Sequence, residues 1–321
     1  MEGAQVWQCS QVVQQAGPLQ NWAAVNMKRP AEVTLGIDLA SKTGICEIEW
    51  DSMSATITRL DVKNIKTKNG WDIVKQAVVE AHEKGWWVGI DAPFGFPEAF
   101  GQSVEALRDP TGKTSGSPHT FSQAPFSDAR VWRATEKITK DASGIDHLLS
   151  TVTDQITGHV INCDDLRYEA IGRARNWADG RLGCTTGIVE VYPAAALKIW
   201  KAPVGNYKTD KNDLEELVKW LFRRRSAPWL RAGTNRNKST LNRNTLKSEA
   251  DAFDALICAL IARLASLRGG PTCPYHHTFT PAQMDLFRSE GWIHLPPLAP
   301  TLCYLDPANI PNIGQCPQCG G

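Results

Sequence analysis

The sequence has little net charge and no long, uninterrupted apolar segment. Its 321 residues carry a net charge of +1, so only local clusters of charge can indicate an anionic partner. The longest apolar stretch, residues 252–267, is interrupted by Arg263 and is too short to span a bilayer comfortably. The first residues also lack the basic start and apolar core of a secretion signal. We therefore expect a cytoplasmic protein without membrane spans, in which the nine cysteines are mostly reduced thiols.

The sequence also lacks internal repeats and a complete Walker-type phosphate loop. Gly112-Lys113-Thr114 has the ending of such a loop, but Leu107 stands where its first glycine is required. "GIDLASKTG", from Gly36, is similar to the first phosphate loop of actin-like and sugar-kinase ATPases, which need a second copy of their sheet. The chain has little room for a second sheet. An ATP-binding phosphotransferase therefore remains only an alternative function.

The hydrophobic patterns predict an α/β fold. Strand patterns begin at Val33, Thr43, Ala55, Trp86 and Gly187. Helical patterns cover residues 70–85, 164–179, 213–225 and 248–267. The first three strands are close enough for an antiparallel meander, and the strand–helix–strand order that follows implies a parallel pair with a right-handed crossover. This order predicts a ribonuclease-H-like mixed five-stranded sheet flanked by helices.

The same patterns divide the chain into three parts. Residues 1–32 have weak periodicity and are interpreted as a leader. The ribonuclease-H-like domain is expected over residues 33–300, with a long insertion of loop and helix at about 94–187. Residues 301–321 are expected to be a C-terminal tail.

Carboxylates follow or end several of the predicted strands. Asp38 and Asp91 each come directly after a buried apolar run, and Glu190 lies in the last strand. Asp251 and Asp254 are three residues apart and share one face of the last helix. Because loops and ligands gather at the carboxyl ends of parallel strands, these side chains should meet there. Clustered carboxylates repel one another unless a cation neutralises them, so they predict a site for Mg²⁺ or Mn²⁺, as in two-metal phosphodiester cleavage.

Each of these carboxylates also has a structural interpretation. Asp38 and Asp91 could cap loops, and Glu190 could pair with a nearby arginine. "SEAD" is similar to a capping box in which Ser248 is the N-cap and Asp251 reaches back to it. The coincidence of five such residues favours a functional site.

Several motifs together resemble a known family. They are "LGIDLA", "GIDAPFGFP", "WRATE", "EVYPAAAL", "NYK", "ADAFDALICAL" and "EGWIHLP", in this order between about residues 33 and 297. The ordered set resembles the predicted nuclease family called domain of unknown function 429, which is assigned to the ribonuclease-H-like superfamily.

The resemblance implies roles for individual residues. Asp38, Asp91 and the pair Asp251 and Asp254 would be the metal ligands of a nuclease that hydrolyses DNA or RNA. Other residues would lie in or beside the site: Arg133, Glu136, Glu190, Tyr192 and Lys208. We expect Asp38, Asp91 and Asp251 to hold the ions with Asp254 and Glu190 in supporting catalytic roles, and Arg133, Glu136, Tyr192 and Lys208 to bind the substrate. Of these, Lys208 and Arg133 are expected to contact a phosphate.

A basic stretch precedes the last helix. Between Leu217 and Ser248 the sequence has no acidic residue but nine basic ones: Lys219, Arg223, Arg224, Arg225, Arg231, Arg236, Lys238, Arg243 and Lys247. Trp220, Phe222 and Trp229 lie among them, which suits phosphate neutralisation combined with base stacking. The alternatives are a solvated loop with its aromatics in the core, and a nucleic-acid-binding module without catalysis.

The tail contains possible zinc ligands. "CPQCGG" has the shape of half a zinc ribbon, with Cys316 and Cys319, and Cys273 with His276 offers a second half. The interval between the two halves is longer than in a usual zinc ribbon, and Cys303 or His277 could replace one of the ligands. The alternative is a free tail without zinc.

Overall fold

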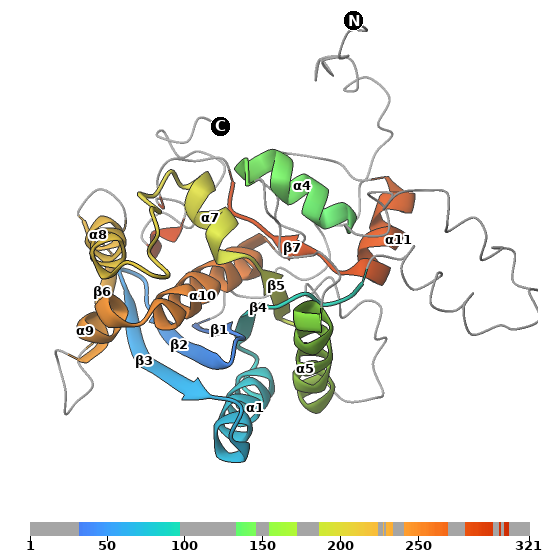
Figure 1. Ribbon diagram of the computed structural model, residues 1–321, viewed down its shortest axis with the longest axis horizontal. Coiled ribbons are helices and arrows are strands. Elements are labelled where there is room, and N and C mark those ends of the chain that lie inside the picture. Colours follow the sequence, from blue (N-terminus) through green and yellow to red (C-terminus); the bar gives the residue numbers. More distant parts are fainter. Residues whose placement is uncertain are drawn as a thin grey trace, which may run out of the picture.

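The computed structural model describes residues 32–96, 133–145, 154–171, 186–223, 227, 229–233, 241–268, 280–297, 302 and 305–307. These residues form an α/β arrangement of strands and helices, which Figure 1 shows. The predicted leader, much of the predicted insertion and most of the predicted tail lie outside the described residues.

A seven-stranded mixed sheet forms the middle of the fold. Its strands are β1 (Val33–Asp38), β2 (Lys42–Trp50), β3 (Ala55–Asn64), β4 (Trp87–Asp91), β5 (Ile188–Val191), β6 (Leu230–Ala232) and β7 (Ile293–His294). Their order is β6-β3-β2-β1-β4-β5-β7. The pairs among β1, β2 and β3 are antiparallel, and the remaining pairs are parallel. The mixed α/β sheet was therefore predicted correctly, but the number of five strands was wrong, because short strands extend both edges.

Eight helices are found in the described residues. They are α1 (Lys68–Glu83), α4 (Ala134–Ser143), α5 (Asp154–Ile171), α7 (Pro193–Ile199), α8 (Lys211–Leu221), α9 (Leu241–Ser248), α10 (Ala250–Arg268) and α11 (Pro281–Glu290). None of these described helices has the length and apolar character needed to cross a membrane. α5 begins ten residues before the predicted helix start at 164.

The start of α10 corrects the capping-box alternative for Asp251. Ser248 is the last residue of α9, and its hydroxyl donates to the Thr245 carbonyl at 3.3 Å. α10 begins only at Ala250. Ser248 is therefore not the N-cap of α10, and Asp251 has no capping box to complete.

Helices cover both faces of the sheet. α10 lies across one face together with α7, α8 and α9, whereas α1 and α5 lie on the other (Figure 1). Every residue of α10 from Ala252 to Ala262 is buried, as expected for a helix between a sheet and further helices. On the opposite face, Ile37 and Ile90 pack with Val78 of α1. The alternating pattern of β1 and β4 thus separates two hydrophobic layers.

Glycines in the sheet allow α10 to approach it closely. A Cβ atom at Gly36 would clash with the carbonyl oxygen of Ala255, and one at Gly89 would clash with that of Cys258. A Cβ atom at Gly44 would meet the carbonyl oxygen of Asp251 in the same way. The helix backbone therefore rests directly on these strands. This contact brings the first turns of α10 over the ends of β1 and β4.

Candidate functional site

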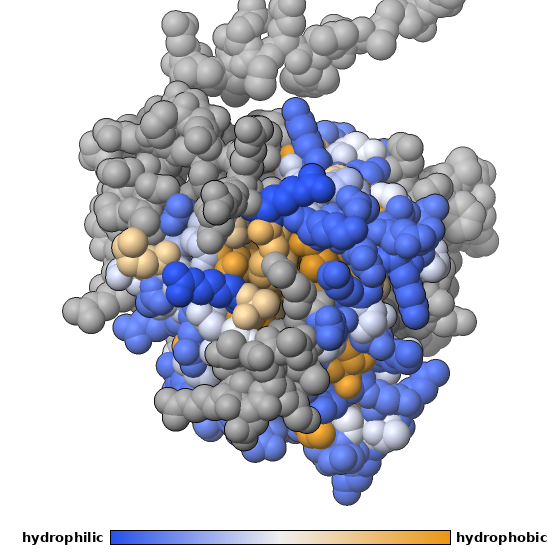
Figure 2. Space-filling model, turned by 90° about the vertical axis from the view of Figure 1, so that its left-hand side faces the viewer, coloured by the Kyte–Doolittle hydropathy of each residue, from blue (hydrophilic) through white to orange (hydrophobic). Residues whose placement is uncertain are grey.

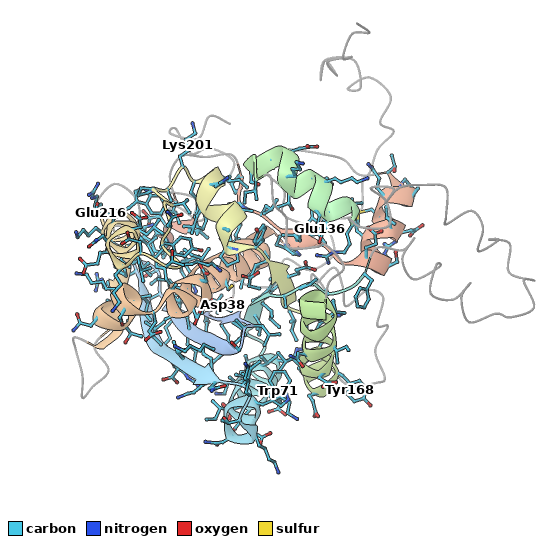
Figure 3. All side chains as sticks on the ribbon, viewed as in Figure 1. Asp38, Trp71, Glu136, Tyr168, Lys201 and Glu216 are labelled. Carbon is cyan, nitrogen blue, oxygen red and sulfur yellow. The ribbon has the colours of Figure 1, made fainter. Side chains whose placement is uncertain are left out.

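The parallel pairing of β1 with β4 places Asp38 directly beside Asp91. Both aspartates end their strands. Because side chains alternate along a strand, Asp38 and Asp91 extend from the face that carries Gly36 and Gly89, which is the face that α10 covers. Figure 3 shows Asp38 beside α10 in the middle of the molecule.

α10 adds two more carboxylates at this place. Asp254 is fully buried, and Asp251 is half-buried one turn earlier. The carbonyl group of Asp251 lies against Gly44, which pairs with Asp38 in the sheet. The four aspartates, Asp38, Asp91, Asp251 and Asp254, are called the acidic cluster below. They come from β1, β4 and α10, and all four were named as metal ligands in the sequence analysis.

Burial and mutual repulsion raise the pKa values of the acidic cluster. The pKa of Asp38 lies well above its ordinary value, first because of burial and then because of the charges of Asp254 and Asp91. Burial raises the pKa of Asp91 to about 7, although Lys208 opposes the shift. Burial also raises the pKa of Asp254, again against the attraction of Lys208. Without a further cation, these groups therefore keep protons at a pH at which isolated aspartates are charged.

Lys208 supplies positive charge to the cluster. Its Nζ atom lies 2.8 Å from Oδ2 of Asp254, and the hydroxyl of the preceding Tyr207 donates to Oδ1 of Asp254 at 2.7 Å. Tyr207 is 4% exposed and packs edge-on against Phe253, whereas the Lys208 side chain is 56% exposed. The dipeptide thus binds both oxygens of Asp254, with one side chain in the core and the other at the surface.

The donor atoms of the cluster suit a hard divalent cation. Oδ1 of Asp91 is buried and has no hydrogen-bond partner in the described part of the chain. Such an oxygen is costly to bury, and carboxylate oxygens are preferred ligands of Mg²⁺ and Mn²⁺. However, no three Asp, Glu, His or Cys side chains among the described residues are arranged to hold a metal ion as they stand. Among the described residues, the cluster therefore has the donor atoms for a divalent cation but not a ready-made arrangement of them.

A second charged group, called the arginine clamp, consists of Arg133, Glu136 and Glu190. The sheet pairs Glu190 with Ile90, so its side chain leaves the face opposite to Asp91. Arg133 is 2% exposed, and its Nη2 atom donates to the carboxylates of both glutamates. Burial would lower the pKa of Arg133, but the two glutamates raise it above its usual value, so the group stays charged. The alternative in which Glu190 pairs with an arginine is thus confirmed.

The arginine clamp holds the turn that follows Asp91. Oε2 of Glu190 accepts a hydrogen bond from the Phe94 N–H at 2.9 Å and another from Nη1 of Arg133 at 2.8 Å. Nη1 also donates to the carbonyl of Glu290 at 3.1 Å. Arg133 thus donates to several oxygens of the protein itself. Its contact with a substrate phosphate stays a prediction.

Tyr192 borders the same small pocket as the arginine clamp and Asp91. It is the N-cap residue of α7 and lines a small pocket together with Asp91, Arg133 and Glu190. Burial raises the pKa of Tyr192 to about 12, with a further increase from Asp91. Its hydroxyl therefore keeps its proton near neutral pH and remains a hydrogen-bond donor.

Part of the basic stretch lines a surface pocket between α8 and α9. Lys219, Arg223 and Lys247 border this pocket. Nζ of Lys219 lies 2.9 Å from Oε1 of Glu216, and Nη2 of Arg223 lies 3.8 Å from Oε2 of the same carboxylate. Glu216 therefore offsets some of the positive charge. The side of the molecule with α8 and α9 is largely hydrophilic, with small apolar areas (Figure 2). The pocket remains a candidate for phosphate contacts.

Other predicted residues do not add to the described site. Trp229 is 4% exposed and packs against Trp50 with ring centroids 5.6 Å apart, so this aromatic belongs to the core, as the alternative interpretation held. Two groups lie outside the described residues: Arg224 and Arg225 of the basic stretch, and the proposed zinc ligands Cys273, His276, Cys316 and Cys319.

Two further residues of the site were not predicted. Tyr207 belongs to "NYK", but only its lysine was selected, because a tyrosine beside a lysine gives no signal that it will reach a buried carboxylate. Glu290 belongs to "EGWIHLP", and its carboxylate accepts the Ala134 N–H at the start of α4 at 2.7 Å. The two motifs "WRATE" and "EGWIHLP", far apart in the sequence, therefore meet at one point of the structure.

Taken together, these features define a mixed α/β domain with an acidic cluster at the carboxyl ends of two central parallel strands. The chain belongs to the family described as "Protein of unknown function (DUF429)", whose model matches residues 36–278. The match confirms the resemblance, although "EGWIHLP" lies beyond the matched range. No curated protein and no solved structure matches the chain.

Proposed function

We propose that the protein is a divalent-metal-dependent nuclease with a ribonuclease-H-like fold. The acidic cluster carries this proposal, because Asp38 and Asp91 pair at adjacent strand ends beneath Asp254. The Oδ1 atom of Asp91, which is buried without a hydrogen-bond partner among the described residues, supports a role as a ligand of a divalent cation. The order β3-β2-β1-β4-β5 within the sheet, with only β2 antiparallel to its neighbours, supports the fold assignment.

The residues of the site would have different roles in metal binding and substrate contact. Asp38, Asp91 and Asp254 would hold Mg²⁺ or Mn²⁺, with Asp251 contributing from the more exposed edge. Such ions lower the pKa of a bound water and stabilise the leaving oxygen during phosphodiester hydrolysis. Lys208, which reaches the surface, would contact a phosphate of the substrate.

The arginine clamp would act by positioning. Glu190 binds the Phe94 N–H three residues after Asp91, and Arg133 holds Glu190 in place. This support would keep the Asp91 carboxylate in one orientation, as positioning groups around metal ligands commonly do.

Nucleic acid, either DNA or RNA, is the substrate that fits this chemistry. Its backbone would lie along the α8–α9 side, where Lys219, Arg223 and Lys247 border a surface pocket. Arg224 and Arg225, which follow in the sequence and lie outside the described residues, are predicted to take part in the same binding. Phosphate neutralisation by basic side chains gives sequence-independent binding.

A cleavage assay with matched variants tests the proposal. Wild type, Asp38→Asn, Asp91→Asn and the exposed control Asp72→Asn are incubated with labelled single-stranded DNA, double-stranded DNA, RNA or ATP over a range of Mg²⁺ and Mn²⁺. We expect metal-dependent cleavage of a nucleic acid by wild type and Asp72→Asn, and none by Asp38→Asn or Asp91→Asn. The metal-free melting temperature of both inactive variants should hold or rise, because the amide relieves like-charge repulsion.

Other results would point to other functions. Intact cleavage with a lower melting temperature in Asp91→Asn would make this aspartate a structural cap. Metal-dependent hydrolysis of ATP alone would favour the phosphotransferase alternative. Binding of nucleic acid without any cleavage would favour a non-catalytic binding module.

A further inference from the structure

The loop that carries Lys208 has a fixed backbone. Gly205 has φ +45°, and a side chain there would meet the Asp213 carboxylate, which accepts the Asn206 N–H at 2.6 Å. The Thr209 and Asp210 N–H groups both donate to the carbonyl of Asn206 at 2.8 Å. The buried ring of Tyr207 adds an anchor in the core. The backbone of Lys208 is thus held from both sides, and its long side chain is the movable part.

Lys208 is the cation that contacts the acidic cluster through Asp254. Its Nζ atom lies 2.8 Å from Oδ2 of Asp254, whose other oxygen accepts the hydrogen bond from Tyr207. One ammonium does not neutralise the cluster, since Oδ1 of Asp91 stays without a hydrogen-bond partner among the described residues. The ammonium therefore occupies the cluster as a single positive charge among several carboxylates.

Removing this ammonium from the cluster would disturb little else. The side chain of Lys208 is 56% exposed, so its Nζ atom is able to move into solvent by rotation of the lysine stem alone. Asp254 would keep its hydrogen bond from Tyr207. Lys208 therefore combines a close ion pair with a short path to water.

We propose that Lys208 is an internal counter-ion, which occupies the acidic cluster in the metal-free protein and is displaced into solvent when a divalent cation binds. This inference rests on the metal-binding half of the proposed function. It also connects the two roles of the side chain, because an ammonium released from Asp254 is free to contact a substrate phosphate beside the site.

Calorimetric measurement of Mn²⁺ binding tests whether a divalent cation displaces the Lys208 ammonium, which is called the exchange below. Removing a competing positive charge should tighten binding, so Lys208→Met should bind Mn²⁺ at least about tenfold more tightly than wild type. Its metal-free melting temperature should fall, and saturating Mn²⁺ should restore it. The charge-preserving variant Lys208→Arg and the exposed control Lys211→Met should both resemble wild type.

Labelling of the wild-type protein gives a second readout that needs no variant. An amine-acylating reagent should modify Lys208 faster in the presence of Mg²⁺ than in its absence, while the rate at Lys211 should stay constant, as read by peptide mass spectrometry. Unchanged or slower labelling of Lys208 would overturn the exchange.

The outcomes also separate this inference from the proposed function. If wild type binds Mn²⁺ but Lys208→Met binds it equally or more weakly, the counter-ion role is wrong and the metal site stands. If neither wild type nor any of the variants binds a divalent cation, the proposed function fails, and the exchange fails with it.

Discussion

Asp91 keeps its proton to a higher pH than an isolated aspartate, because burial and the neighbouring charges of Asp254 and Glu190 disfavour its charged form against the attraction of Lys208. The folded state therefore holds protons that the unfolded chain has already released. A folded state that binds more protons than the unfolded state loses stability as the pH rises. The same direction applies to Asp38 and Asp254.

This sign gives a prediction for the metal-free protein. An aspartate ordinarily has a pKa of 3.8, and that of Asp91 in the folded protein is about 7. The free energy of unfolding should fall as the pH rises between these two values. The slope should reach up to about 1.4 kcal/mol per pH unit for each such group. Denaturant melts across this range measure it. Asp91→Asn should show a smaller slope, and a stability that rises with pH in both proteins would contradict the assignment of these protons.

The sequence predicted that the aspartates at the strand ends lie together, but not which other side chains they contact. A carboxylate at the end of an apolar run is visible in the sequence, and the pairing of Asp38 with Asp91 follows once their strands are neighbours. The contact between Tyr207 and Asp254 joins positions 47 residues apart, through a loop with no periodic pattern. A pattern-based prediction has no means to find such a contact.

At the scale of elements, the backbone of α10 packs directly on the sheet. A methyl group at Gly89 would push against the Cys258 carbonyl and lift the helix that carries Asp251 and Asp254. Gly89→Ala should therefore reduce the free energy of unfolding by about 1–3 kcal/mol, the usual cost of overpacking. It should also weaken Mn²⁺ binding, because the α10 carboxylates would move away from Asp38.

Gly70→Ala provides the matched control for this change. A Cβ atom at Gly70, in the first turn of α1, would clash with the Asn64 carbonyl at the end of β3, and α1 packs on the face of the sheet that α10 does not cover. This variant should lose stability to a similar extent but keep the wild-type affinity for Mn²⁺. Equal loss of affinity in both variants would show that general destabilisation, and not the position of α10, sets metal binding.

The arginine clamp makes a different element-level prediction, because it joins β5, α4 and the turn after β4. Arg133→Met would leave the carboxylates of Glu136 and Glu190 buried without their cation. Removing one partner of a buried ion pair should lower the free energy of unfolding by about 3–5 kcal/mol. Thermal or denaturant unfolding measures this loss, and Glu136→Gln, which keeps a polar group at the same place, should cost less. A fall below about 1 kcal/mol for Arg133→Met would mean that the clamp is not a stabilising unit.

Across the whole molecule, the sequence predicted the centre of the sheet better than its edges. β1 to β5 have apolar runs and recognisable turns, whereas β6 has three residues and β7 has two, which is too short for any periodic pattern. The start of α10 was misjudged because "SEAD" satisfies the capping-box pattern, although α9 precedes it directly. Local patterns fail where the tertiary arrangement determines which of two neighbouring elements a residue joins.

The distribution of charge over the whole molecule leads to the last prediction. The net charge is +1, so attraction to nucleic acid depends on where the basic residues lie. Arg223 is exposed at the pocket between α8 and α9, and its neighbours Arg224 and Arg225 follow in the sequence. Each phosphate contact that is removed should reduce the slope of log K against log salt concentration by about one. We therefore expect Arg223→Gln/Arg224→Gln/Arg225→Gln to bind labelled DNA or RNA more weakly and with a flatter salt dependence.

The matched control for this experiment is Lys68→Gln, which removes an exposed positive charge at the start of α1, on the opposite face of the sheet. Fluorescence anisotropy titrations at several salt concentrations give the slope for each protein. The control should retain the wild-type slope, since no phosphate is expected to lie near α1. The triple variant should also keep its affinity for Mn²⁺, because none of the three arginines belongs to the acidic cluster. An unchanged salt slope in the triple variant would place the nucleic acid on another surface, and a loss of Mn²⁺ binding would show that the substitutions had disturbed α10 itself.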